Sequence, residues 1–255
     1  NANIDPQTGL NKSLKGTNLK GLDLSDKNFD DVCIIETNLE GTNADIDPQT
    51  VSNKSIEKAC LLGLDLSNKS FNDICVIGAN LEETKADIDP QNIRYRSLKK
   101  TNLKGLDLSN KCFDNTYIYG ANLEGTKANI NPQKLVAKSL EKTCLLGLDL
   151  SGKCFDDICI KECNLEGTNA SINPQTINNK SLYKTNLKGI NLFGKDFTDV
   201  YIYKTNLEKT NAYINKDIIN DSSDLENSNL IGCSIFNNET ACSYVKNYIK
   251  KKIKI

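Results

Sequence analysis

The sequence predicts a coiled, repetitive fold that turns a corner every five residues. Residues 17–46 divide into the groups TNLKG LDLSD KNFDD VCIIE TNLEG TNADI. The third residue of each group, called the centre residue below, is apolar: Leu19, Leu24, Phe29, Ile34, Leu39 and Ala44. A period of five fits neither the 3.6-residue period of a helix nor the two-residue period of a single strand. It fits short straight sides that each point one side chain inward.

This small–polar–Leu/Phe–any–any pattern resembles that of the pentapeptide-repeat proteins over roughly residues 1–236. The resemblance implies an all-β fold, a right-handed quadrilateral parallel β-helix (solenoid) with four pentapeptides per coil. We therefore expect about eleven coils in residues 1–236 and a separate C-terminal segment over residues 237–255.

A longer unit is marked by the five prolines, which recur every 42 residues. They are Pro6, Pro48, Pro90, Pro132 and Pro174, in units that begin near residues 1, 43, 85, 127, 169 and 211. Since 42 is eight fives plus two, each unit holds two coils and a two-residue bulge, where proline is tolerated because it donates no ladder hydrogen bond. The centre residue before the bulge is Ala in each unit, which leaves room for the next Ile, such as Ile46, to fold inward.

Stacking the coils predicts an unbroken column of leucines. Its members are Leu19, Leu39, Leu61, Leu81, Leu103, Leu123, Leu145, Leu165, Leu187, Leu207 and Leu230. The preceding residue is usually Asn, and stacked amides can bond along the axis. A lysine such as Lys27 or Lys69 recurs at an inward position, where an unpaired charge would be costly. We expect these lysines to reach a corner beside Asp30, Asp31 and their equivalents.

The C-terminal segment has the pattern of a helix. Asn237, Asn238 and Glu239 offer a helix start. Apolar residues then follow at helical spacing, among them Tyr244, Val245, Tyr248 and Ile249. We expect an α-helical cap over residues 239–252, which covers the last coil or contacts a second copy.

The composition argues against an enzyme. Histidine is absent, which excludes His-based acid–base catalysis, His-activated nucleophiles and His metal ligands. Carboxylates recur in every unit, whereas a catalytic pair is normally a local exception, and no phosphate-binding Gly loop is present. We predict no catalytic residue, no metal site, no cofactor and no small-molecule substrate.

The ten cysteines do not suggest a disulfide framework. Cys33, Cys75 and Cys159 are separated by 42 residues or a multiple of 42, so equivalent thiols lie two coils, or roughly 9–10 Å, apart. That separation is too long for a disulfide. Free thiols favour a cytoplasmic location, and no apolar run has transmembrane length, so no membrane association is predicted.

One outward stripe is a candidate partner-binding surface. Its residues flank the centre residues of one side: Ile35, Ile77, Tyr117, Tyr119, Tyr201 and Tyr203. Exposed apolar patches mark docking sites, but sheets also tolerate surface Tyr and Ile, and both interpretations are open.

Two functions follow. The first is a non-enzymatic, rigid solenoid that acts as a protein-interaction or structural module, through a protein partner or self-association. The alternative comes from the resemblance, since some pentapeptide-repeat proteins are DNA mimics that bind DNA gyrase and protect it from quinolones. Aspartates such as Asp30, Asp114 and Asp156 support mimicry, but neighbouring lysines and a formal net charge of −1 weaken the field. Direct nucleic-acid binding is not expected.

Overall fold

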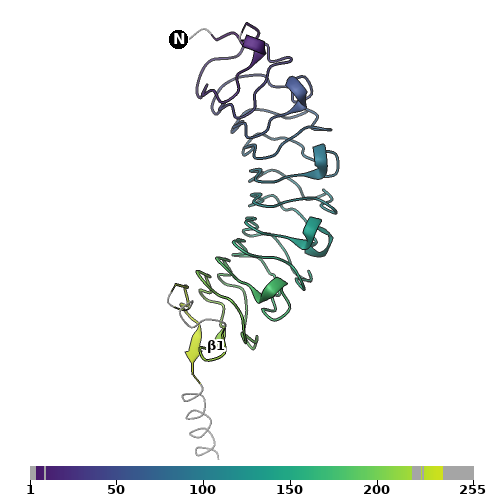
Figure 1. Ribbon diagram of the computed structural model, residues 1–255. Helices are drawn as coiled ribbons and strands as arrows, with labels where there is room; N and C mark the ends of the chain where they lie inside the picture. Colours follow the sequence, from purple (N-terminus) through teal and green to yellow (C-terminus); the bar gives the residue numbers. More distant parts are fainter. Residues whose placement is uncertain (1–3, 9, 220–224, 226, 238–255) are drawn as a thin grey trace, which may run out of the picture.

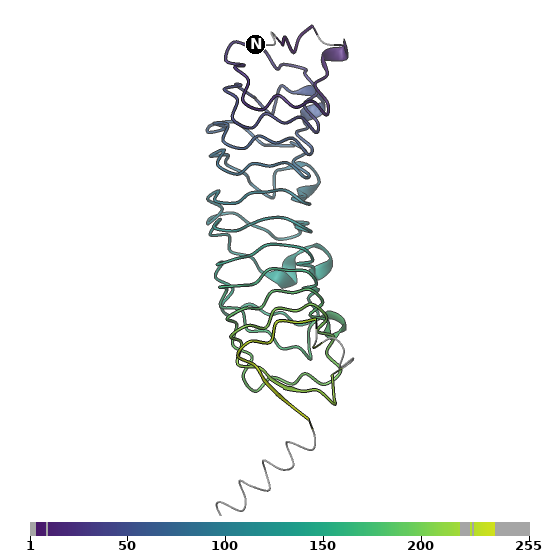
Figure 2. The ribbon, with the colours of Figure 1, turned by 90° about the vertical axis from the view of Figure 1, so that its left-hand side faces the viewer.

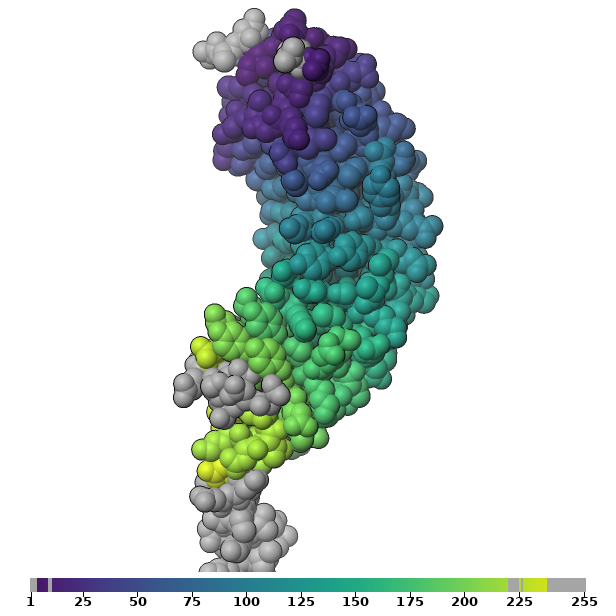
Figure 3. Space-filling view, in the orientation of Figure 1, coloured from purple at the N-terminus to yellow at the C-terminus, as the bar shows by residue number. Residues whose placement is uncertain are grey.

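The protein is a curved rod of stacked coils (Figure 1). The computed structural model describes residues 4–8, 10–219, 225 and 227–237. Successive parts of the chain follow one another along the rod from one end to the other, and a view from the side shows the coils as a regular stack (Figure 2). Side chains fill the spaces between coils on the face in view (Figure 3).

Parallel bridges between neighbouring coils define the register. Asn18 pairs with Asn38, Asn38 with Cys60, and Cys60 with Asn80, and the series continues to Asn229. The spacing therefore alternates between 20 and 22 residues. This alternation agrees with the predicted unit of two four-sided coils plus a two-residue bulge.

Regular elements are short because each side is only a few residues long. The 3-10 turns are η1 (Leu10–Lys12), η2 (Ser52–Lys54), η3 (Arg94–Arg96), η4 (Pro132–Lys134), η5 (Val136–Lys138) and η6 (Asn178–Lys180). The strands β1 (Tyr213–Asn215) and β2 (Ser234–Phe236) pair in parallel, with Ile214 opposite Ile235. The turns η2 to η6 lie along the convex edge of the rod (Figure 1). The two extra residues of every second coil widen that edge, which accounts for the curvature.

The inward columns form the core. The predicted leucine column is buried from Leu19 to Leu207, while Leu230 is partly buried. The inward Ile after each bulge is also confirmed, because Ile46, Ile88 and Ile130 have no exposed surface. Corners between sides are tight turns, as at Leu14–Thr17, where Thr17 N donates to Leu14 O over 3.0 Å and Gly16 has a φ of 70°. Such a left-handed residue is easily accommodated by Gly.

The glutamine after each proline closes the bulged side with its side chain. Gln91 Nε2 donates to Cys112 O (3.1 Å) and to Asp114 O (2.8 Å) on the next coil. Gln7, Gln49 and Gln175 bond the equivalent carbonyl pairs. The amide therefore replaces backbone donors where the bulge interrupts the ladder, and buried acceptors stay paired.

The predicted position of the inward lysines was wrong. Lys69 Nζ lies 2.7 Å from Asp45 Oδ1, and Lys111 pairs with Asp87. These partners belong to the preceding coil, 24 residues earlier, and not to the corner at Asp73, the equivalent of Asp31. The lysine stem stays half-buried along the side while its amine reaches a carboxylate at the surface.

We predict that Leu103→Ala lowers the free energy of unfolding by about 2–5 kcal/mol, because it opens a cavity in the leucine column. Leu103 has no exposed surface. Urea unfolding followed by circular dichroism measures the change. The control is Leu146→Ala, at an outward, half-buried position. Equal effects of the two substitutions would contradict the assignment of inward and outward residues.

Candidate functional site

The predicted stripe residues lie on one side of the rod, on alternate coils. Bridges between Ser97 and Tyr117 and between Ser181 and Tyr201 place each tyrosine beside a serine of the preceding coil. All six predicted residues, Ile35, Ile77, Tyr117, Tyr119, Tyr201 and Tyr203, are half-buried. The stripe is therefore a surface of ring faces and edges and not a protruding ridge.

A cluster of three tyrosines forms near the C-terminal end of this stripe. Tyr183 stacks on Tyr201 with ring centroids 5.9 Å apart and an interplanar angle of 4°. It also stacks on Tyr203 at 5.9 Å, and Tyr201 and Tyr203 lie 6.4 Å apart. Sequence analysis missed Tyr183 because the equivalent positions of other units hold Lys15, Glu57, Lys99 and Glu141. Its place two residues after Ser181 was the available signal.

Lysines at the adjacent corner contact the tyrosine rings. Lys184 Nζ lies 4.8 Å from the ring centroid of Tyr183, and Lys142 Nζ lies 5.3 Å from that of Tyr119. The hydrogen bond with the Tyr183 side chain is the largest cause that raises the pKa of Lys184. Glu162 joins the two lysines at 3.7 and 3.9 Å. The two groups of tyrosines are thus connected along one edge by a chain of charged contacts.

Other large apolar side chains are more exposed than the stripe. Tyr95 is 80% exposed, Ile231 67% and Phe193 65%. Phe193 packs edge-on against Tyr213 with centroids 5.5 Å apart. These positions were missed because each departs from the repeat in one unit only, so no column revealed it.

The described titratable groups are not arranged for acid–base chemistry. Hydrogen bonds from Ser67 and Lys85 lower the pKa of Asp65, and hydrogen bonds from Asn43 and Ser25 lower that of Asp23. Shifts in this direction keep the carboxylates ionised at neutral pH and disfavour a general-acid role. Burial raises the pKa of the Cys163 thiol, which makes it a poor nucleophile.

Metal and membrane sites were also searched within the described part of the chain. No group of three or more Cys, Asp or Glu side chains there could hold a metal ion. No helix in that part is long and apolar enough to span a bilayer. The nine described cysteines are free thiols, as predicted. The predicted helix residues Tyr244, Val245, Tyr248 and Ile249 lie outside the described residues.

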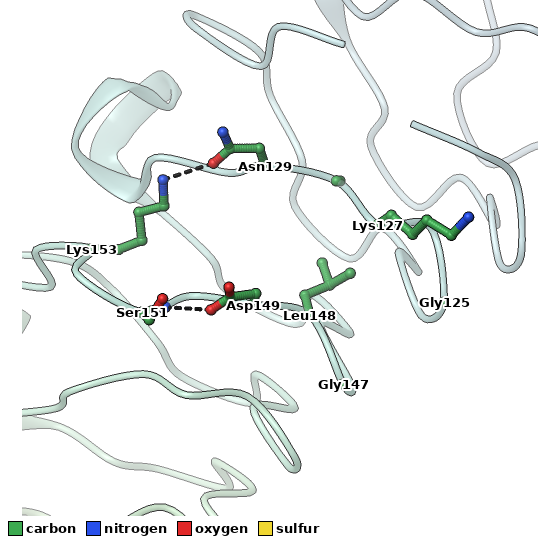
Figure 4. A pocket seen from close by; sticks show the side chains of 9 residues that line it. Gly125, Lys127, Asn129, Gly147, Leu148, Asp149, Ser151 and Lys153 are labelled. Carbon is green, nitrogen blue, oxygen red and sulfur yellow. Dashed lines mark hydrogen bonds between the residues drawn. The ribbon is translucent and has the colours of Figure 1, made fainter. Parts of the chain in front are cut away.

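A hollow of about 540 Å³ lies between two coils on the side that follows the leucine column (Figure 4). Lys153 Nζ donates to Asn129 Oδ1 over 2.7 Å at one edge of it, and Lys127 lies at the other. Ser151 N donates to Asp149 Oδ1 over 2.9 Å. The small buried centre residue Ala128 explains the hollow, because no larger side chain fills this side from within.

An equivalent hollow of about 410 Å³ occurs one unit earlier, lined by Lys85, Asp87 and Asp107 among others. There Asp87 takes the place of Asn129 and pairs with Lys111. The recurrence identifies these hollows as products of the repeat. The difference leaves Lys153 bonded to a neutral amide where Lys111 has a carboxylate.

Comparison with known proteins adds little to this geometry. No family profile matches the chain, and no curated protein sequence matches it. Structures of QnrB1, described as a plasmid-mediated fluoroquinolone resistance protein, overlap it at low similarity. A trypsin-treated variant is 12% identical over 96% of this chain and 92% of that chain, with a TM-score of 0.20. The full-length protein is 13% identical over 96% and 93%, with a TM-score of 0.14. At these TM-scores the fold assignment depends on the coil geometry itself.

We predict that Asn129→Asp raises the unfolding midpoint by an amount equivalent to at most ~1 kcal/mol, because Lys153 then gains the carboxylate that Lys69 and Lys111 have. Thermal unfolding at low and high salt measures this, and the gain should shrink at high salt. Asp87→Asn is the reverse control and should lower the midpoint. A destabilised Asn129→Asp variant would contradict the assigned pairing.

Proposed function

We propose that this chain is a rigid, non-enzymatic protein-interaction rod whose tyrosine stripe contacts a protein partner. The observation that carries the proposal is the stacked cluster of Tyr183, Tyr201 and Tyr203. Coil stacking does not require these rings, since equivalent coils hold Lys, Glu, Ile or Cys at the same outward positions. Tyrosine is enriched at the energetic centres of protein interfaces.

Rigidity supports the same role. The tyrosines flank buried centre residues, Leu182 and Ile202, and their backbone bonds neighbouring coils, as when Leu182 N donates to Tyr201 O over 2.8 Å. Side chains held in this way lose little conformational entropy on binding. Lys184 and Lys204 at the rim would stay hydrated beside a partner, as polar rim residues do.

The DNA-mimic alternative is less well supported by the charge arrangement. Mimicry of a phosphate backbone needs rows of uncompensated carboxylates, but Asp114 pairs with Lys134 at 2.9 Å and Glu124 with Lys104 at 3.4 Å. Neighbouring opposite charges cancel beyond a Debye length. A DNA gyrase supercoiling assay with purified protein separates the two ideas, since an effect at micromolar concentration would favour mimicry.

We predict that Tyr201→Ser together with Tyr203→Ser reduces partner capture at least about tenfold, since interface tyrosines commonly contribute 1 kcal/mol or more each. The measurement is quantitative pull-down from lysate, with sedimentation velocity to detect self-association. Phe193→Ser with Tyr213→Ser removes two exposed aromatic rings elsewhere and is the matched control. Loss of capture in the control alone would move the interface, and no loss in either would reject the stripe.

A further inference from the structure

The turn η3 is where one unit departs outward from all the others. Its residues are Arg94, Tyr95 and Arg96, and these are the only two arginines of the chain. The position of Tyr95 is held by Asn11, Asn53, Ala137 and Asn179 in the other units. Tyr95 is the most exposed large apolar residue among those described. We call Arg94–Arg96 the corner knob.

Folding does not account for the tyrosine at this corner. Tyr95 has a φ of 60° and a ψ of 10°, in the left-handed region, which Asn adopts more readily than a bulky residue. Its ring is 80% exposed, so burial does not offset the unfavourable backbone. The residue is therefore explained better by an external contact than by stability.

Arg94 holds the corner knob in place. Its Nε lies 3.2 Å from Asp73 Oδ1 and its Nη2 lies 3.3 Å from Asp73 Oδ2. Its Nη1 also donates to Asn53 O over 2.9 Å, so the side chain ties η3 to two earlier coils. This bidentate arrangement fixes the base from which Tyr95 and Arg96 project.

Arg96 differs from its equivalents because it lacks a counter-ion on the next coil. Lys12 lies 3.9 Å from Asp31, and Lys138 lies 3.7 Å from Asp157. The residue at the same place after Arg96 is Asn115. Asp73 on the preceding coil is engaged by Arg94. Within the described residues Arg96 is therefore an exposed guanidinium without an ion pair, next to an exposed ring.

We propose that the corner knob binds an acidic segment of a protein partner, with the Arg96 guanidinium on a carboxylate and the Tyr95 ring on an adjoining apolar side chain. A long polyanion fits less well, because Asp31, Asp157 and Asp199 lie along the same corner and would repel it. The pairing of Arg with Tyr matches the composition of interface hot spots. This inference rests on the proposed interaction role and deepens it, but it uses residues outside the tyrosine stripe.

The test starts from a phage-displayed library of random 12-residue peptides selected on the full-length protein. A peptide enriched on it is synthesised, and its Kd is measured by fluorescence anisotropy. Selection of peptides rich in Asp and Glu, with a Kd at least tenfold weaker for Arg96→Gln and for Tyr95→Asn, supports the inference. Lys54→Gln removes the same charge from the equivalent corner one unit earlier and should leave the Kd unchanged.

Failure is recognisable in each arm. Peptides without acidic residues, or equal weakening by Lys54→Gln and Arg96→Gln, would overturn the inference. So would a single-stranded 12-nucleotide DNA that competes for Arg96 as well as the peptide does. Tyr95→Asn restores a residue that other units carry, so the variant should fold, and its unfolding midpoint should not fall. The Tyr201/Tyr203 variant should still bind the peptide, which separates failure of the stripe from failure of the corner knob.

Discussion

No coil of this protein can stand alone, because a single coil buries one side chain per side and leaves its backbone groups unpaired. The leucine column and the parallel bridges from Asn18 to Asn229 supply both requirements from the neighbouring coils. Stability is therefore a sum of contacts between neighbours, as expected of solenoids. The same constraint leaves every outward position free to vary, which is why the candidate binding residues are all outward.

The five-residue period, the 42-residue unit and the buried columns could be predicted from sequence, because each inward residue recurs many times. The polar contacts that close the sides were harder to foresee. Thr37 Oγ1 donates to Leu14 O over 2.8 Å, and Thr101 Oγ1 donates to Val76 O over 2.8 Å. Gln91 bonds two carbonyls of the next coil. Periodicity identifies such columns, but it does not say which acceptor a side chain reaches, and the partners of Lys69 and Lys111 were misassigned for this reason.

The candidate site shows the opposite limit. Repetition made the stripe of Tyr117, Tyr119, Tyr201 and Tyr203 visible in the sequence, but it hid the residues that break the pattern once. Tyr183 completes the cluster from a coil whose equivalents are charged, and Tyr95 projects from a corner otherwise occupied by Asn or Ala. In a repeat protein the scaffold is explained by what recurs. The outward exceptions, which the scaffold does not need, are the better guide to binding.

Hydrogen exchange of individual amides, followed by NMR, tests the stacked coils most directly. Leu61 N, Leu81 N and Leu103 N each donate to a carbonyl of the next coil over 2.9 Å, whereas Lys104 N donates to the side chain of Asn102 at the surface. The account predicts slow exchange at the leucines, recurring at alternating intervals of 20 and 22 residues, and fast exchange at Lys104. Protection in continuous runs of ten or more residues, as in a helix, would contradict it.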